Sequence, residues 1–110
     1  PMIKNKGGKI INITSVIGQI GNPGQSNYCA SKAGVDALSE ALMQELRHEK
    51  IRVSCVAPGS VDTRTMDTLS REAGWKLTAA DVAQVIVDLL QHDSRSLPSR
   101  IEVRPARPQP

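Results

Sequence analysis

The sequence predicts an α/β protein built on a parallel sheet. Three short runs rich in β-branched residues, 9–14, 51–57 and 101–103, are separated by two stretches with helical periodicity. Strands that alternate with helices imply right-handed crossovers and parallel pairing. Three strands and two helices make about half of a doubly wound sheet, which normally has about five or six strands. With 110 residues, the chain forms one domain at most.

The first half of the chain predicts a strand, a glycine-rich loop and a helix. Lys9–Thr14 is a short β-branched run, and the glycines and proline that follow at 18–24 predict a loop after this strand. From Ser26 to about Arg47, apolar residues recur at three- and four-residue spacing, which indicates an amphipathic helix. We expect its apolar face to consist of Val35, Leu38, Ala41, Leu42 and Leu46.

The second half predicts a strand, a polar loop, a helix and a last short strand. Ile51–Ala57 is a second β-branched run, which Pro58 and Gly59 end. The polar stretch 60–76 predicts a loop with room for one helical turn. The run 101–103 predicts a brief strand before the proline-rich end of the chain.

The helix of the second half has a defined start. Thr78 is followed three residues later by Asp81, a spacing typical of a capping box, in which each side chain accepts a backbone N–H of the other residue. We expect this helix to run to about Gln91. Its expected apolar face consists of Val82, Val85, Ile86, Leu89 and Leu90.

Charge and composition exclude several classes of protein. The 14 basic and 11 acidic residues give a net charge of +3. The excess lies in the last sixteen residues, which hold four arginines and one glutamate. The sequence has neither a basic stripe nor the aromatic residues that stack on bases, so we expect no nucleic-acid binding.

The same inspection gives no sign of a membrane or metal protein. No apolar stretch approaches the ~20 residues that span a bilayer, and no signal peptide is recognisable. Cys29 and Cys55 lie 26 residues apart, without a CxxC motif or a histidine at ligand spacing. We therefore expect no metal site, and two isolated thiols suit the reducing cytoplasm.

Tyr28 is the only tyrosine, and Lys32 follows it by four residues. On a helix, this spacing places both side chains on one face. A cation beside a phenol favours its ionised form, so the hydroxyl can exchange a proton at neutral pH. Taken alone, the pair is more often an incidental surface pair than an active site.

Two further segments follow strands at the same predicted edge of the sheet. Ser15 comes directly after the first strand, at the carboxyl edge where α/β sheets bind ligands. The segment 58–63 follows the second strand, and Pro58 and Gly59 there let the backbone approach a flat ligand. The structural alternatives are a serine that ends a strand and an ordinary turn.

Together these segments resemble one family, the classical short-chain dehydrogenases/reductases. The match consists of Ser15, Tyr28-x-x-x-Lys32 and Pro58-Gly59-x-Val61-x-Thr63, in the order and spacing of the family, over about residues 8–92. The stretch 21–28 most resembles the 3-oxoacyl-carrier-protein reductase-like members. The resemblance implies the C-terminal half of a Rossmann-like doubly wound parallel sheet. Residues 1–110 would then be the catalytic portion of one NAD(P)-binding domain, without its N-terminal dinucleotide-binding half.

The resemblance also implies catalytic roles for three residues. Tyr28 would give a proton to the substrate carbonyl oxygen, or take one from the alcohol. Ser15 would hydrogen-bond the same oxygen and stabilise its developing charge. Lys32 would favour ionisation of the phenol and hold the ribose hydroxyls on the nicotinamide side of the cofactor, which Tyr28 also contacts.

The other matched positions would bind the cofactor, NAD or NADP. Pro58 and Gly59 would lie against the nicotinamide, the Val61 backbone would bind its carboxamide, and Thr63 would bind the carboxamide or the diphosphate. The glycine-rich turn that holds the pyrophosphate, the further catalytic asparagine and the residue that selects NAD or NADP have no counterpart in the sequence.

From the resemblance we expect an NAD(P)-dependent oxidoreductase that interconverts a small-molecule carbonyl and a secondary alcohol by hydride transfer. It would be cytoplasmic and form a homodimer or homotetramer. The 110-residue chain alone is expected to be inactive. The alternative, from another class, is a non-catalytic fragment that acts as a subunit-assembly module. The last strand lacks the Gly-Gly pair of many members, which favours a general carbonyl or hydroxy-acid substrate.

A few other residues have less specific roles. Trp75 lies in the loop where relatives place a substrate lid, so substrate contact and loop anchoring are equally open. For Met66, in the same loop, lining a pocket and being a mobile surface residue are equally open. His48 and His92 lie near helix ends, where a histidine interacts with the helix dipole, and we expect no catalytic role for them.

Overall fold

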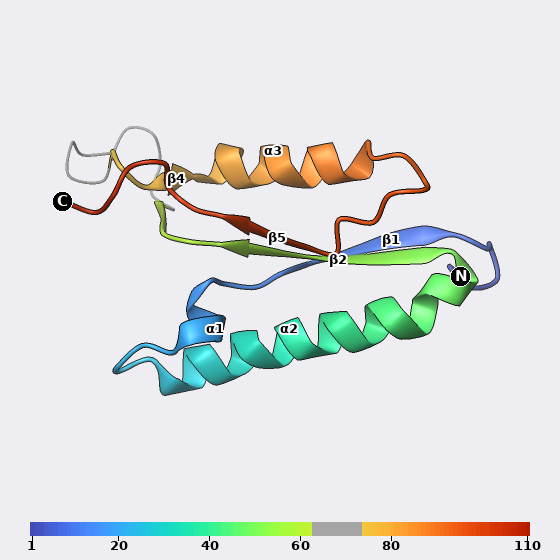
Figure 1. The fold of residues 1–110 in the computed structure, drawn as a ribbon, viewed down its shortest axis with the longest axis horizontal. Helices are drawn as coiled ribbons and strands as arrows, with labels where there is room; N and C mark the ends of the chain where they lie inside the picture. The colour runs from blue at the N-terminus through green and yellow to red at the C-terminus, as the bar shows by residue number, and fades with distance from the viewer. Residues whose placement is uncertain (63–73) are drawn as a thin grey trace.

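The main sheet has three parallel strands between two helices. The computed structural model describes residues 1–62 and 74–110. Strands β1 (Gly8–Ile13), β2 (Ile51–Pro58) and β5 (Arg100–Val103) pair in the order β1-β2-β5. Helix α2 (Ser26–Leu46) covers one side of this sheet, and helix α3 (Ala79–Leu90) covers the other (Figure 1). The predicted α/β class with a parallel sheet is therefore confirmed.

The register of the strands aligns their carboxyl ends. Ile13 of β1 pairs with Val56 of β2, and Pro58 of β2 pairs with Val103 of β5. Beyond the ladders, the Gly59 amide donates to the Val103 carbonyl at 2.7 Å. Because parallel strands end at the same edge, the segments after β1, β2 and β5 leave the sheet side by side. We call this the carboxyl edge of the sheet.

The central strand β2 forms the core. It has a strand on each side and a helix layer over each face, and six of its eight residues are buried. Val53 and Val56 are the largest side chains that lose all contact with solvent. A nearly continuous apolar run is typical of a strand buried on both faces. The β-branched, apolar pattern at 51–57 therefore reflects the burial of this strand on both faces.

The apolar face expected on α2 is partly wrong. Leu38 is 53% exposed, whereas Ser39 is 3% exposed and faces the sheet. The Ser39 hydroxyl donates to the Val35 carbonyl at 2.7 Å and accepts from the Asn12 side chain of β1 at 2.8 Å. These two hydrogen bonds satisfy the Ser39 hydroxyl on the buried face of the helix. The helix can therefore pack with Ser39 toward the sheet and Leu38 toward solvent. A short 3-10 turn, η1 (Arg47–Glu49), ends this helix.

Helix α3 begins at the predicted capping box. The Asp81 amide donates to the Thr78 hydroxyl at 3.2 Å, and the Thr78 amide donates to the Asp81 carboxylate at 2.8 Å. Leu89 is buried as expected. Leu90, which was assigned to the same face, is instead 55% exposed, because it lies one residue, or about 100°, round the helix from Leu89.

Two segments expected to be loops contain additional structure. Residues Ile17–Ile20 form the short helix α1, which packs on α2 (Figure 1). At the ends of the expected loop 60–76, β3 (Val61–Asp62) pairs in parallel with β4 (Leu77–Thr78). These dipeptides are too short to show any periodicity, so pattern analysis missed them. The helical turn allowed within 60–76 would fall on residues outside the described part.

Candidate active site

One pocket at the carboxyl edge collects residues from each predicted motif. Its volume is about 610 Å³. Ser15 enters from the end of β1, Tyr28 from the first turn of α2, and Gly59 from the end of β2. The remaining described lining residues are Val16, Ile17, Ile20, Gln25, Ser60, Trp75, Arg104, Pro105, Arg107 and Gln109. None of the described lining residues is acidic.

Ser15 is held by its backbone surroundings. It is 6% exposed, and the amide of Val16 beside it donates to the Pro58 carbonyl at 3.2 Å. The Ser15 hydroxyl oxygen accepts the amide of Ile17, at the start of α1, at 3.2 Å. A hydroxyl that accepts one bond retains its own proton for donation. In the described part of the chain, nothing accepts that proton, so Ser15 can donate it into the pocket.

Tyr28 and Lys32 lie on one face of α2, as their spacing predicted. The Lys32 ammonium is 5.7 Å from the centroid of the Tyr28 ring. Tyr28 is 44% exposed and lines the pocket, whereas Lys32 does not line it. A cation over a phenol ring is attracted to its π-face and holds the ring in place. The structure thus brings Ser15 and Tyr28 to one pocket, with Lys32 beside the phenol.

The close approach of α1 to α2 depends on Gly18. A β-carbon at Gly18 would lie 2.9 Å from Cβ of Lys32 and 3.0 Å from the Ala33 nitrogen. Gly21 and Gly24 have positive φ angles of 70° and 81°, so they shape the turns between the two helices. All three glycines therefore serve the segment between Ser15 and Tyr28.

The residues assigned to the second-strand loop divide into three groups. Gly59 lines the pocket. Pro58 ends β2 and Val61 lies in β3, opposite Leu77, and neither of them lines the pocket. Thr63 lies outside the described residues, as does Met66.

The C-terminal tail is the part of the pocket that sequence reasoning missed. Arg104, Pro105 and Arg107 follow β5 and line the same space as Tyr28. Pro105 lies close to the second-strand turn, since a β-carbon at Gly59 would be 3.3 Å from its Cδ. The signal that could have found this tail is the strand order, because a last strand beside β2 ends at the same edge. Trp75 also lines the pocket. Its position therefore fits both interpretations given above, contact with a substrate and anchoring of the loop.

A polar cluster that the sequence did not indicate includes Thr14, the residue before Ser15. The Cys55 thiol donates to the Asp36 carboxylate at 3.1 Å and lies 3.2 Å from the Thr14 hydroxyl. Arg100 of β5 binds the same carboxylate oxygen at 3.0 Å. Burial alone would raise the pKa of Asp36, but the hydrogen bonds from Cys55, Thr14 and Arg100 reverse this and lower it. Burial raises the pKa of the Cys55 thiol, so this cysteine stays neutral.

The described residues contain neither a cluster of metal-ligating side chains nor a membrane-spanning helix. In 1–62 and 74–110, no three side chains of histidine, cysteine, aspartate or glutamate gather as a metal site would require. In the same ranges, no helix combines the length and the apolar character needed to cross a membrane.

Comparison with known families and proteins adds independent information. A family model described as short chain dehydrogenase matches residues 1–74. Nodulation protein G of Rhizobium meliloti (strain 1021) is 49% identical over 79 residues, which cover 72% of this chain and 32% of that protein. The 3-oxoacyl-[acyl-carrier-protein] reductase FabG of Haemophilus influenzae is 41% identical over 103 residues, which cover 84% of this chain and 43% of that reductase. The chain thus spans about a third of the first relative and less than half of the second.

A solved structure agrees with these matches. It is described as "Crystal structure of a putative betaketoacyl-ACP reductase" and superposes with a TM-score of 0.79 at 28% identity. The superposition covers 94% of this chain and 48% of the other. The resemblance drawn from Ser15, the Tyr28–Lys32 pair and the segment 58–63 thus has independent support from sequence and from structure.

Proposed function

This chain belongs to the short-chain dehydrogenase family, and on that basis we propose that it is the catalytic portion of a longer NAD(P)-dependent oxidoreductase. The enzyme interconverts a small-molecule carbonyl and a secondary alcohol by hydride transfer. The observation that carries the proposal is that Ser15 and Tyr28 line one pocket, at the carboxyl edge where parallel α/β sheets bind ligands.

The two hydroxyl groups have complementary tasks. Ser15 donates its free proton as a hydrogen bond to the substrate carbonyl oxygen, which orients the carbonyl and stabilises charge on that oxygen. Tyr28 transfers its proton to the same oxygen during reduction and takes one back during oxidation. Lys32 supplies positive charge beside the Tyr28 ring, where it can offset the negative charge that develops on the phenol oxygen as the proton leaves.

The pocket lining fits the nicotinamide end of a dinucleotide. A bound nicotinamide supplies or receives the hydride. The wall at Gly59 has no side chain, so a flat ring can approach the backbone there. Pro58, Val61 and Thr63 complete the proposed contacts, and Lys32 holds the ribose hydroxyls. The family generally uses NAD(P)H, and nothing in the described residues selects NAD over NADP.

The lining also indicates the substrate class. Ile17, Ile20 and Trp75 provide apolar surface, whereas Arg104 and Arg107 provide the charged side chains of the tail. An apolar wall with a few polar groups suits a small organic carbonyl compound. The relatives named as 3-oxoacyl-[acyl-carrier-protein] reductases make a 3-oxoacyl group one member of the substrate class to test.

The test is a hydride-transfer assay on the whole protein that carries this chain. NADPH or NADH is mixed with an activated ketone ester, and the loss of cofactor absorbance is compared with the amount of alcohol formed. We expect one alcohol per cofactor oxidised. Failure of both cofactors with ketone esters, and of both oxidised cofactors with the matching alcohols, would contradict the proposed reaction.

A second function, subunit assembly without catalysis, is favoured by the exposed apolar side chains of the two helices. Leu38 of α2, and Val87 and Leu90 of α3, are each at least 50% exposed. Because α2 and α3 lie on opposite sides of the sheet, each helix can pair with its symmetry mate (Figure 1). A homodimer or homotetramer would form in this way, and the same contacts would serve the enzyme.

Cofactor binding by residues 1–110 separates the two functions. We propose that this chain has no counterpart of the glycine-rich turn that binds pyrophosphate, so alone it neither binds NADPH tightly nor transfers hydride. Fluorescence titration with NADPH measures this directly. Cofactor oxidation by the isolated chain that Tyr28→Phe abolishes would show that the cofactor site is more complete than we propose.

A further inference from the structure

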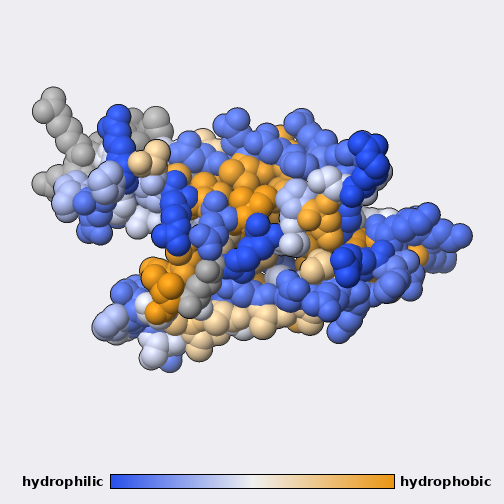
Figure 2. Space-filling view, viewed as in Figure 1, coloured by the Kyte–Doolittle hydropathy of each residue, from blue (hydrophilic) through white to orange (hydrophobic). Residues whose placement is uncertain are grey.

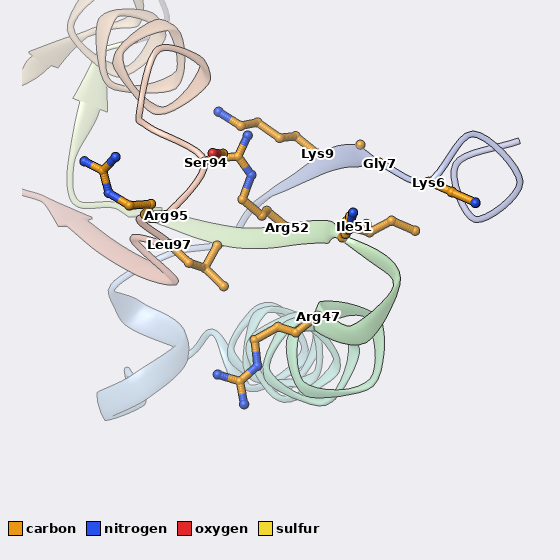
Figure 3. A pocket seen from close by; sticks show the side chains of 11 residues that line it. Lys6, Gly7, Lys9, Arg47, Ile51, Arg52, Ser94, Arg95 and Leu97 are labelled. Carbon is orange, nitrogen blue, oxygen red and sulfur yellow. The ribbon is translucent and has the colours of Figure 1, made fainter.

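A second hollow lies at the amino ends of the strands, opposite the candidate active site. We call it the basic hollow, and its volume is about 850 Å³. The turn before β1, the start of β2, the end of α2 with η1, and the loop after α3 all contribute to it (Figure 3). Such a volume is typical of small-molecule sites, whereas nucleic acid requires a long basic stripe.

The charged residues of the basic hollow are all cations. None of its described lining residues is acidic, and the six cationic ones are Lys6, Lys9, Arg47, Lys50, Arg52 and Arg95. Of these six cations, Arg95 alone forms an ion pair with another described residue, Asp93, at 3.3 Å. Its side chain is 85% exposed, so this pair contributes little. The other five cations therefore have no anionic partner among residues 1–62 and 74–110.

Lys9 and Arg52 form the centre of this charge. They are direct neighbours in the register of β1 and β2, and Figure 3 shows both side chains extending toward the loop that carries Ser94. Neighbouring strands are only about 4.8 Å apart, and like charges at such positions repel. Reduced solvation and the charge of Arg52 lower the pKa of Lys9. An anion between them would remove this repulsion.

Backbone carbonyls hold both side chains in place. The Lys9 ammonium donates to the Leu89 carbonyl at 2.6 Å, and the Arg52 guanidinium donates to the Asp93 carbonyl at 3.2 Å. Each bond uses one donor, so most of the donors of both groups stay free. Because the side chains are already positioned, binding a ligand costs less conformational entropy.

We propose that the basic hollow binds a small ligand that carries two or more phosphate groups. Arginine forms bidentate bonds to phosphate oxygens, and the neighbouring lysine adds a point charge. A single carboxylate would neutralise one of five unpaired cations, whereas a chain of phosphates can contact several. Arg47 lies on the other side of β2 and points away from Lys9 and Arg52 (Figure 3), so we expect the phosphates to lie on the side of these two residues. The site is independent of the proposed oxidoreductase function.

Calorimetric titration of the 110-residue chain with inorganic tripolyphosphate tests the proposal. We expect saturable binding to one site that weakens as salt is added. Replacing both central cations, Lys9→Gln with Arg52→Gln, should weaken binding at least about tenfold. The matched control, Lys76→Gln with Arg107→Gln, removes two positive charges at the opposite edge and should change the Kd less than about twofold. Absence of saturable binding, or an unchanged Kd in the double variant, would overturn the proposal.

Amide chemical shifts of the unmodified chain give a readout that does not depend on the variants folding. Tripolyphosphate should shift the signals of Gly7, Arg52 and Ser94 and leave those of Tyr28 and Gly59 unchanged. Shifts confined to Tyr28 and Gly59 would assign the anion to the candidate active site and overturn the proposal.

Comparison of ligands identifies the source of the phosphates. ATP binding more tightly than tripolyphosphate supports a nucleotide ligand, and equal affinity supports an inorganic one. Tighter binding of a short DNA duplex, at equal phosphate concentration, would overturn the assignment to a small ligand.

Discussion

Ser15 has a structural role in the fold and, in the function we propose, a catalytic role as well. Its oxygen accepts the Ile17 amide and so supports the start of α1, while its proton remains free to act on a ligand. The sequence left open whether this serine only ends a strand. Because the hydroxyl both accepts and can donate, the two roles do not exclude each other.

Ser15→Ala tests the catalytic share of this residue in the whole protein. Loss of one donor to a developing oxyanion typically costs about 10²–10³ in kcat, and we expect a loss in that range. The temperature of thermal unfolding should change little, because the helix that Ser15 supports, α1, has only four residues. Ser31→Ala is the control, since its hydroxyl donates only to the Tyr28 carbonyl. A Ser15→Ala enzyme with unchanged kcat would leave Ser15 with its structural role alone.

The placement of Ser15 and Tyr28 at one pocket, with Lys32 beside the phenol, was predictable because each residue lies next to a strong local signal. The exposed position of Leu38 was not predictable, because the bond between Asn12 and Ser39 decides which side of α2 faces the sheet. Periodicity reflects only the spacing of apolar residues. It cannot predict the hydrogen bond between Asn12 and Ser39, which are 27 residues apart.

At the scale of elements, the position of α1 on α2 depends on one glycine. Gly18→Ala would place a methyl group 2.9 Å from Cβ of Lys32, where side chain and backbone both resist displacement. We expect a loss of about 1–3 kcal/mol in the free energy of unfolding, as for other overpacked sites. Urea unfolding measures it, with Gly34→Ala as the control, since no atom lies within 4 Å of a β-carbon there. Equal stability of the two variants would contradict the packing account.

The cluster of Asp36, Cys55, Thr14 and Arg100 joins α2 to three segments of the sheet. Since the pKa of Asp36 is lowered in the folded chain, its stabilisation is complete above about pH 4 and is lost as the pH falls through the lower, folded value. We expect Asp36→Asn to cost about 1–3 kcal/mol at pH 7 and to flatten the loss of stability in acid.

Urea unfolding between pH 2 and pH 7 checks this expectation. Asp93→Asn is the matched control, because its ion pair with Arg95 lies on the surface. A wild-type stability that does not fall below about pH 4 would contradict the assigned role of Asp36.

Elements with local signals were predicted and elements with non-local causes were missed. The capping box of α3 lies within four residues and was found from Thr78 and Asp81 alone. The tail at Arg104 and Pro105 reaches the pocket only because β5 pairs with β2, and no property of the tail itself indicates that pairing. Strands β3 and β4 form from two dipeptides with 14 residues between them, and neither dipeptide carries a pattern of its own.

The molecule as a whole is less compact than a complete domain of its size. Its radius of gyration is 15.8 Å, whereas a compact chain of this length has about 13 Å. Figure 2 shows apolar surface in the space between the two helix layers. Among the described strands, β1 has a neighbour on one side only, so its other edge can pair with a further strand. Both features fit our proposal that the chain is one part of a larger sheet.

This incomplete surface leads to a prediction for the isolated chain. We expect residues 1–110 to self-associate, because exposed apolar side chains and an open strand edge both favour contact between copies. Light scattering should give a mass above that of the 11.9 kDa monomer, increasing with concentration. A monomer at every concentration would show that these surfaces do not attract one another.

We propose that Tyr28 is the proton donor of a hydride-transfer reaction, and Tyr28→Phe in the whole protein tests this role. The change removes one hydroxyl and keeps the ring beside Lys32. With NADPH or NADH and a ketone ester, we expect turnover to fall by on the order of 10²-fold or more while cofactor affinity is kept. Cys29→Ala, the neighbouring control, should keep its turnover. Near-normal turnover of Tyr28→Phe would contradict the assignment of Tyr28 as the proton donor.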